Sequence, residues 1–209
     1  DVRVMGIDDG GSLHTYVDVS YGVHVDLRSQ TGGVMSMGHG TFSQKSRKQK
    51  LNTKSSTEAE VVGVADMLPY NIWLRNFLES QGYILTENIL YQDNQSAIRM
   101  EKNGRRSCTG NSRHISIRYF FVKDRVDKKE VSIKYCPSNY MLADYFTKPL
   151  QGKLFRCLRA VIMGHKPISW LKTVIEPTKE RVKRKINENS KIVVDSKIAG
   201  RRNITVIEK

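Results

Sequence analysis

The first part of the chain alternates between apolar and polar residues with the period of two that is typical of a β-strand. In the stretch HTYVDVSY at 14–21, Val17 and Val19 share one face and Asp18 lies on the other. Two more strands are expected at 31–37 and 41–48, joined by a glycine-containing turn at 38–40. These three segments predict an antiparallel meander.

The apolar positions then change to helical spacing. Ser55, followed three residues later by Glu58, has the pattern of a capping box at the head of an apolar run that reaches residue 82. Pro69 lies inside this run. Because proline removes one helical hydrogen bond and clashes with the preceding turn, a kink or a break is expected near Leu68.

The second half of the chain alternates between strands and helices. The expected elements are a strand at 88–92, a helix that starts within 93–96, a basic glycine-broken loop within 99–118, a helix at 115–128, a strand at 131–135, and a mostly helical segment at 139–163 interrupted at Pro149. This alternation predicts an α/β fold with a mixed sheet flanked by helices.

Composition changes after Gly164. Residues 172–209 contain eleven Lys or Arg against five acids, and this excess is typical of a basic tail. The expected division is an N-terminal linker remnant at 1–12, one folded domain at 13–164 and a partly disordered basic C-terminal extension at 165–209.

Charge and cysteine content narrow the function. A formal net charge of +14 predicts attraction to polyanions, either nucleic acid or an anionic membrane. Three cysteines without CxxC spacing argue against a disulfide framework or a zinc site and favour a reducing compartment. No apolar run approaches the ~18 residues of a membrane span, so a soluble intracellular protein without a membrane partner is expected. The start at Asp1 indicates a piece of a longer chain or a processed product.

Four carboxylates are placed where strands end or helices begin: Asp18, Glu60, Asp93 and Asp144. A fold that gathered them would create a cluster of negative charge that is stable only around bound cations. The sequence therefore predicts a metal site of the nuclease type.

Several motifs in order carry a family resemblance: YVDVSYGVHVDLRSQTGGVMSMG, SRKQKLNTKSSTEAEVVG, ILYQDNQSAI, RHISIRYFFVKDRV and YCPSNYMLADYFTKPLQGKLF. Together they resemble the ribonuclease H domain of Ty1/copia-type LTR retrotransposon Pol polyproteins, from about residue 14 to 164. The resemblance implies an RNase H-like fold with a five-stranded mixed sheet and cleavage of the RNA strand of RNA/DNA hybrids. It also implies two Mg²⁺ ions, with Mn²⁺ as the alternative, and no small-molecule cofactor.

The resemblance also implies site residues and a partner. Its Asp, Glu, Asp, Asp site corresponds to Asp18, Glu60, Asp93 and Asp144, with Asp18 bridging both ions and Asp144 holding the ion of the attacking water. Glu58 is the alternative to Glu60; the two side chains are rotated by about 200° on a helix, so they face different ways. The expected partner is a reverse transcriptase domain in the parent polyprotein, in a cytoplasmic virus-like particle or in the nucleus.

One departure from the family pattern and two alternative functions bear on this reading. The stretch CPSNYMLAD lacks the histidine that many cellular relatives carry before the last aspartate, so water or another group would have to move protons. A remnant that binds nucleic acid without cutting it is the alternative function. An integrase or transposase of the same broad fold is disfavoured because those enzymes lack a glutamate on the first helix, where Glu60 stands.

Substrate binding is expected to rest on phosphate contacts, which depend on salt and not on sequence. The first candidates are Lys45, Arg47, Lys48, Lys50 and Lys54; the second are Arg105, Arg106, Arg113 and Arg118, with His114 as a helix cap or phosphate contact. Polar groups that could distinguish RNA through its 2′-hydroxyl are Ser20, Asn94 and Gln95.

Overall fold

The computed structural model describes residues 2–7, 11–103 and 113–175, with side chains described from residue 117 onward in the last range. The chain divides into two units, Asp1–Leu171 and Lys172–Lys209. The sheet and the candidate site belong to the first unit. Of the predicted C-terminal extension at 165–209, residues 176–209 lie outside the described residues.

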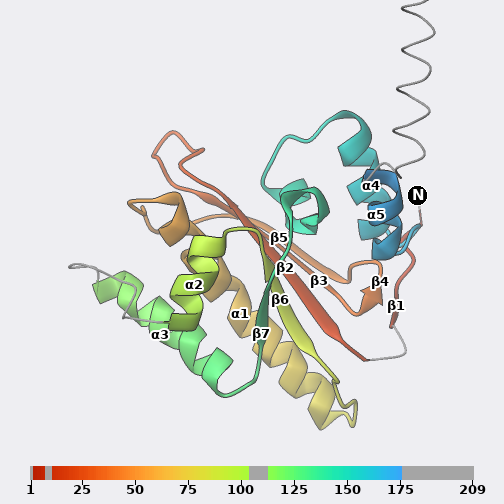
Figure 1. Ribbon diagram of the computed structural model, residues 1–209, viewed down its shortest axis with the longest axis horizontal. Coiled ribbons are helices and arrows are strands. Elements are labelled where there is room, and N and C mark those ends of the chain that lie inside the picture. The colour runs from red at the N-terminus through yellow and green to blue at the C-terminus, as the bar shows by residue number, and fades with distance from the viewer. Residues whose placement is uncertain (1, 8–10, 104–112, 176–209) are drawn as a thin grey trace, which may run out of the picture. The chain divides into compact units, whose positions relative to one another are not determined.

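A five-stranded mixed sheet forms the centre of the first unit (Figure 1). Its strands, in spatial order, are β5 (Ser43–Lys48), β3 (Gln30–Ser36), β2 (Leu13–Ser20), β6 (Asn88–Gln92) and β7 (Ser132–Tyr135). The pairs β5–β3 and β3–β2 are antiparallel, whereas β6 runs parallel to β2 and β7 runs parallel to β6. The meander and the mixed sheet expected from the sequence are confirmed.

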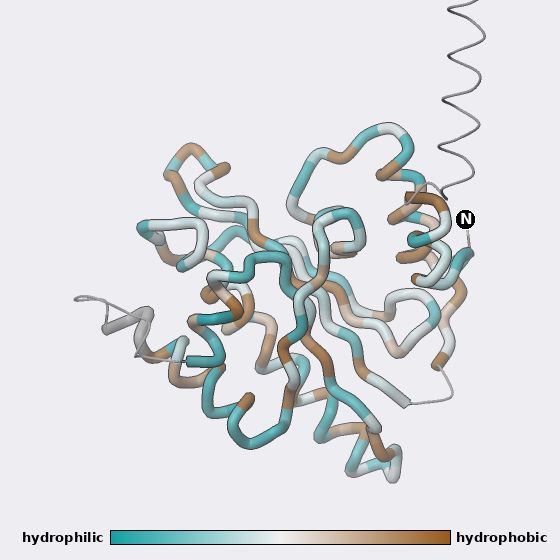
Figure 2. Tube along the Cα trace, in the orientation of Figure 1, coloured by the Kyte–Doolittle hydropathy of each residue, from teal (hydrophilic) through white to brown (hydrophobic). Residues whose placement is uncertain are grey.

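Helix α1 (Ser56–Ser80) covers one face of the sheet and continues through Pro69. Of the kink or break expected near Leu68, the break is therefore wrong, and the kink stays a prediction. Leu68 is fully buried, while Pro69 is exposed. The proline ring therefore lies on the solvent side, and burial of apolar side chains along the same helix outweighs the single lost hydrogen bond. Hydrophobic and hydrophilic positions are interspersed along α1 and the strands (Figure 2).

Two neighbouring glycines in β3 show what covers each face of the sheet. A Cβ atom on Gly33 would collide with Met67 of α1. A Cβ atom on Gly32 would lie 2.6 Å from Thr147 Cγ2 and 2.8 Å from the carbonyl oxygen of Ala143, both from the C-terminal part of the domain. Glycine at these two positions leaves room for the Met67 side chain of α1 on one face and for Ala143 and Thr147 on the other.

The remaining helices fall into two groups along the chain. Helices α2 (Gln95–Asn103) and α3 (Arg113–Asp127) pack with α1, and Val122 of α3 belongs to the same core as Val17 and Leu90. Toward the C-terminus, the short 3-10 helices η2 (Ser138–Tyr140) and η3 (Leu142–Phe146) precede α4 (Gly152–Ile162) and α5 (Ile168–Ile175), and η3 packs on the face of the sheet opposite α1. The helical segment expected at 139–163 is thus two 3-10 turns followed by one α-helix.

The segment before residue 13 contacts the rest of the first unit. Strand β1 (Gly6–Ile7) pairs with β4 (Gly38–His39), within the turn expected at 38–40. The amide of Val4 donates a 2.9 Å hydrogen bond to the carbonyl oxygen of Met163. The domain limits at 12/13 and 164/165 stay predictions. Among the described residues, no helix combines the length and apolar character needed to cross a membrane.

Candidate active site

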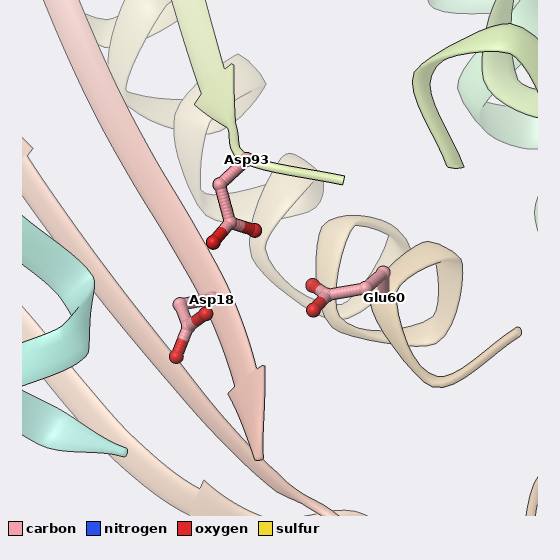
Figure 3. A group of neighbouring side chains, drawn as sticks. All are labelled: Asp18, Glu60 and Asp93. Atoms are coloured by element: carbon pink, nitrogen blue, oxygen red, sulfur yellow. The ribbon is translucent and has the colours of Figure 1, made fainter. Parts of the chain in front are cut away.

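Three acidic side chains from three different elements converge at one end of the sheet. Asp18 comes from β2, Glu60 from the start of α1, and Asp93 directly follows β6. Each offers a carboxylate oxygen, and these oxygens all lie within 4.8 Å of one another. Figure 3 shows the three carboxylates pointing toward a common space.

The strand pairing explains why two of these acids meet. The ladder between β2 and β6 stops at the pair Tyr16 and Tyr91. Asp18 and Asp93 each lie two residues further along their chains, where the two parallel strands have stopped pairing. The carboxyl ends of adjacent parallel strands are where α/β proteins place their functional groups, because the backbone there is free to turn away.

Neighbouring side chains hold the three carboxylates. Gln92 Nε2 donates to Glu60 Oε2 over 3.4 Å, and Ser138 Oγ donates to Asp93 Oδ2 over 2.9 Å. The hydroxyl of Thr147 donates to Asp18 Oδ2. Asp18 is 2% exposed and Glu60 is 6% exposed, so both carboxylates have lost most of their water.

Asp144 reaches the cluster through a lysine. It lies in η3, and its carboxylate does not belong to the group of three closely spaced acids among the described residues. Lys148 Nζ lies 2.8 Å from Asp144 Oδ1 and 3.4 Å from Asp18 Oδ1. The fourth predicted acid is therefore adjacent to the site, joined to Asp18 by one ammonium group.

Burial and mutual repulsion change the acidity of the cluster. Burial, followed by the negative charges of Asp18 and Asp93, raises the pKa of Glu60 to about 9. Burial and then Asp18 raise the pKa of Asp144 to about 6, against the opposing effect of Lys148. For Lys148, burial would lower the pKa, but the hydrogen bond that its ammonium donates to Asp144 and the negative charge of Asp18 raise it. Burial and repulsion therefore favour a proton on Glu60, and the ammonium of Lys148 offsets part of the remaining negative charge.

The donor set suits a hard divalent cation. The three converging groups offer only carboxylate oxygens, which Mg²⁺ and Mn²⁺ prefer, and none of the nitrogen or sulfur ligands that zinc favours. The acids line a pocket of about 440 Å³ together with Asn94, Gln95, Ser96 and Lys148. The chemistry of these residues therefore fits the metal ions expected from the sequence.

Asn94 and Gln95, predicted to contact substrate, both line this pocket. Asn94 Oδ1 also caps α2, because it accepts hydrogen bonds from the amides of Ser96 and Ala97 over 3.0 and 3.1 Å. The loop that follows Asp93 is thereby fixed at the rim of the pocket. Gln95 is exposed there.

The predicted basic contacts are spread over several surfaces. Lys45 and Arg47 pair with residues of β3 that face α1, and Lys45 Nζ lies over the ring of Tyr70. Lys48 forms a 2.7 Å ion pair with Asp26. Lys50 and Lys54 are exposed in the segment that leads to α1.

The second group of basic residues is only partly described. Arg105 and Arg106 lie outside the described residues, and Arg113 and His114 begin α3 with side chains outside the described part. Arg118 pairs with Asp66 of α1. None of these positions is tested as a nucleic-acid contact.

The sequence reasoning did not find the residues that hold the acids in place: Gln92, Ser138, Thr147 and Lys148. Lys148 carried a usable signal, because it stands four residues after Asp144, the spacing that brings two side chains together on a helical turn. The other three contacts join residues at least 32 positions apart, and no local sequence pattern predicts them.

No protein-family model matches the chain. It is 31% identical over 160 residues to the Retrovirus-related Pol polyprotein from transposon TNT 1-94 of Nicotiana tabacum, a match that covers 75% of this chain and 12% of that polyprotein. It is 33% identical over 147 residues to the Pol polyprotein from transposon RE1 of Arabidopsis thaliana, covering 69% of this chain and 10% of the relative. The chain is a relative of the Ty1/copia-type Pol polyproteins. It spans about a tenth of the length of these curated relatives.

Solved structures similar to this Ty1/copia-type segment include LC11-RNase H1 from compost, with 11% identity, a TM-score of 0.48, and coverage of 65% of this chain and 92% of that chain. RNase H1 from Halobacterium salinarum has 15% identity and a TM-score of 0.40, with coverage of 64% and 91%. The five-stranded mixed sheet flanked by helices that the sequence predicts is confirmed by the strand order and directions of the structure.

Proposed function

We propose that this segment hydrolyses the RNA strand of RNA/DNA hybrids as the ribonuclease H part of a Ty1/copia-type Pol polyprotein. The observation that carries the proposal is the convergence of Asp18, Glu60 and Asp93 within 4.8 Å of one another, at the end of a sheet with RNase H-like order. The relationship to the Pol polyproteins supports it.

The acidic residues would hold two divalent cations. Glu60 and Asp93 would hold one ion, Asp144 would hold the other, and Asp18 would be shared between them. When bound, such ions make a water molecule more nucleophilic and neutralise the charge that develops on the leaving 3′ oxygen. Mg²⁺ is the expected ion and Mn²⁺ the alternative.

The protein's own part in the reaction is to keep the ligands in place. Gln92, Ser138 and Thr147 each donate one hydrogen bond to a different carboxylate of the cluster. Donors that fix a ligand's orientation reduce the reorganisation required when charge develops in the transition state. Burial of Asp18 and Glu60 removes competing water from the same groups.

Substrate would bind mainly through its phosphates. Lys54 and Lys50 are exposed beside the head of α1, and the first turn of a helix adds partial positive charge to such a surface. Asn94 and Gln95, which line the pocket, would contact a ribose 2′-hydroxyl, the group that distinguishes RNA from DNA. The hybrid would be supplied by a reverse transcriptase domain elsewhere in the polyprotein.

A panel of substrates tests the proposal. The purified chain is incubated with end-labelled RNA/DNA hybrid, RNA duplex and DNA duplex, each with Mg²⁺ and with a chelator. We expect cutting of the RNA strand of the hybrid alone, and its loss on chelation. Salt-sensitive retention of all three substrates without cutting would contradict the proposal and favour a nucleic-acid-binding remnant.

A further inference from the structure

Lys148 places a positive charge inside the carboxylate cluster. Its ammonium contacts Asp144 Oδ1 at 2.8 Å and Asp18 Oδ1 at 3.4 Å, and it lines the same pocket as Glu60 and Asp93. Of the described residues that line this pocket, it is the only cation. The side chains of Asp18 and Asp144 are 2% and 6% exposed, so the ammonium lies against two largely desolvated acids.

The position of this ammonium coincides with the place where a cation shared by Asp18 and Asp144 would have to lie. Asp18, Glu60 and Asp93 already share a common space that does not involve Asp144, since their oxygens lie within 4.8 Å of one another. A cation held by these three does not require the contact between Lys148 and Asp144 to open. A cation held by Asp18 and Asp144 does.

The backbone fixes where Lys148 starts but leaves its side chain free to move. The amide of Lys148 donates a 3.0 Å hydrogen bond to the carbonyl oxygen of Asp144, so the two residues share one helical turn. The Lys148 side chain is 38% exposed, much more than either acid. Its ammonium can therefore swing outward on a flexible four-carbon chain while Asp18 and Asp144 stay in place.

We propose that Lys148 is a built-in competitor for the second divalent cation: its ammonium occupies the Asp18–Asp144 end of the site in the metal-free protein and must leave before a cation binds there. This inference rests on the proposed metal-dependent function and deepens it. Metal ions then bind in a fixed order, first at Asp18, Glu60 and Asp93, and second, more weakly, at Asp18 and Asp144. Lys148 sets the difference in affinity between the two steps.

Counting bound metal tests this order without measuring cleavage. The metal-free full chain is titrated with Mn²⁺, and free Mn²⁺ is measured by electron paramagnetic resonance. The wild-type protein is expected to bind one ion tightly and a second one weakly. Lys148→Met, which keeps the length of the side chain and removes its charge, is expected to lower the dissociation constant of the second ion by at least about tenfold, the scale of one like charge removed at this distance.

The control is Lys128→Met. Lys128 pairs with Asp124 on α3 over 2.9 Å, also four residues apart, so this variant removes the same charge and the same kind of ion pair away from the site. Lys128→Met is expected to bind Mn²⁺ as the wild type does. Lys148→Arg, which keeps the positive charge, is expected to keep the second ion weak.

A second measurement uses the wild-type chain and does not depend on the folding of a variant. The acetylation rate of each lysine is measured by mass spectrometry with and without Mn²⁺. If metal displaces Lys148, its labelling rises several-fold at concentrations that fill the second site, while the labelling of Lys128 stays unchanged.

The outcomes separate the inference from the proposed function. Equal or weaker binding of the second ion by Lys148→Met, or labelling of Lys148 that falls or does not change when metal binds, would overturn the competitor role and leave a purely structural ion pair. In that case hybrid cleavage by the wild-type chain would still support the nuclease. If neither protein bound Mn²⁺ at all, the metal site itself would be refuted, and this inference with it.

Discussion

The amide of Lys54 donates a 2.8 Å hydrogen bond to Glu58 Oε2, and this contact separates the two glutamates at the head of α1. The amide of Glu58 in turn donates a 3.2 Å hydrogen bond to Ser55 Oγ, so both the amide and the carboxylate of Glu58 take part in capping the helix. Its carboxylate is therefore engaged at the helix end. Glu60, two residues further along the chain, lies close to Asp18 and Asp93 instead.

Matched substitutions of the two glutamates should affect hybrid cleavage very differently. Glu60→Gln is expected to reduce hybrid cleavage at least about a hundredfold, the usual scale for losing one charge-stabilising group. Glu58→Gln should cleave within about twofold of wild type, because glutamine serves equally well in a capping box. Steady-state cleavage assays on both variants check this. A Glu58→Gln variant that loses activity while Glu60→Gln keeps it would reverse the assignment.

Stability of the metal-free protein should fall as pH rises. Burial raises the pKa of Glu101 to about 8, and burial with nearby acids raises the pKa of Glu60 to about 9. Between the ordinary carboxyl value and these raised values, the folded state holds protons that the unfolded state has released. The free energy of unfolding therefore decreases from about pH 5 to about pH 9.

Glu101→Gln isolates the part of this effect that lies away from the carboxylate cluster. Glu101 is fully buried, and neither of its carboxylate oxygens has a hydrogen-bond partner. The variant should be more stable than wild type by about 1 kcal/mol or more near pH 9, and nearly equal to it near pH 5. Urea unfolding across this range in a chelator provides the measurement. Parallel pH profiles for the two proteins would show that Glu101 does not titrate as described.

If phosphates bind beside the head of α1, the affinity for the hybrid should depend on salt concentration. Lys54→Ala should weaken hybrid binding and reduce the slope of log affinity against log salt by about 1, the loss of one phosphate contact. Binding is measured by fluorescence anisotropy in a chelator, which prevents cleavage. Lys128→Ala is the control of equal charge, since Lys128 is paired with Asp124 on α3. An unchanged slope for Lys54→Ala would remove this residue from the interface.

The sequence predicted the parts of the site that depend on where strands end. Asp18 and Asp93 were placed correctly near strand ends because period-two alternation and a short apolar run mark β2 and β6 directly. The break considered at Pro69 does not occur, because local propensity ignores the burial of Leu68 beside it. Propensity of this kind is a weak prior that tertiary packing overrides.

The position of Asp144 relative to the other acids could not be predicted from the sequence. Its place depends on how η3 lies on β3, and this depends on Gly32 leaving room for Thr147 and Ala143. No spacing along the chain reports such an approach. The same is true of Lys148, whose neighbour Asp144 was visible at four residues but whose second partner, Asp18, is 130 positions away.

Cleavage of labelled RNA/DNA hybrid by Asp18→Asn, compared with wild type in Mg²⁺, tests the central claim most directly. Asp18 lies beside Glu60 and Asp93 and is joined to Asp144 through Lys148, so its loss should abolish cutting, by at least about a hundredfold, while circular dichroism shows an intact fold. A folded Asp18→Asn protein that cuts the hybrid as fast as wild type would contradict the account.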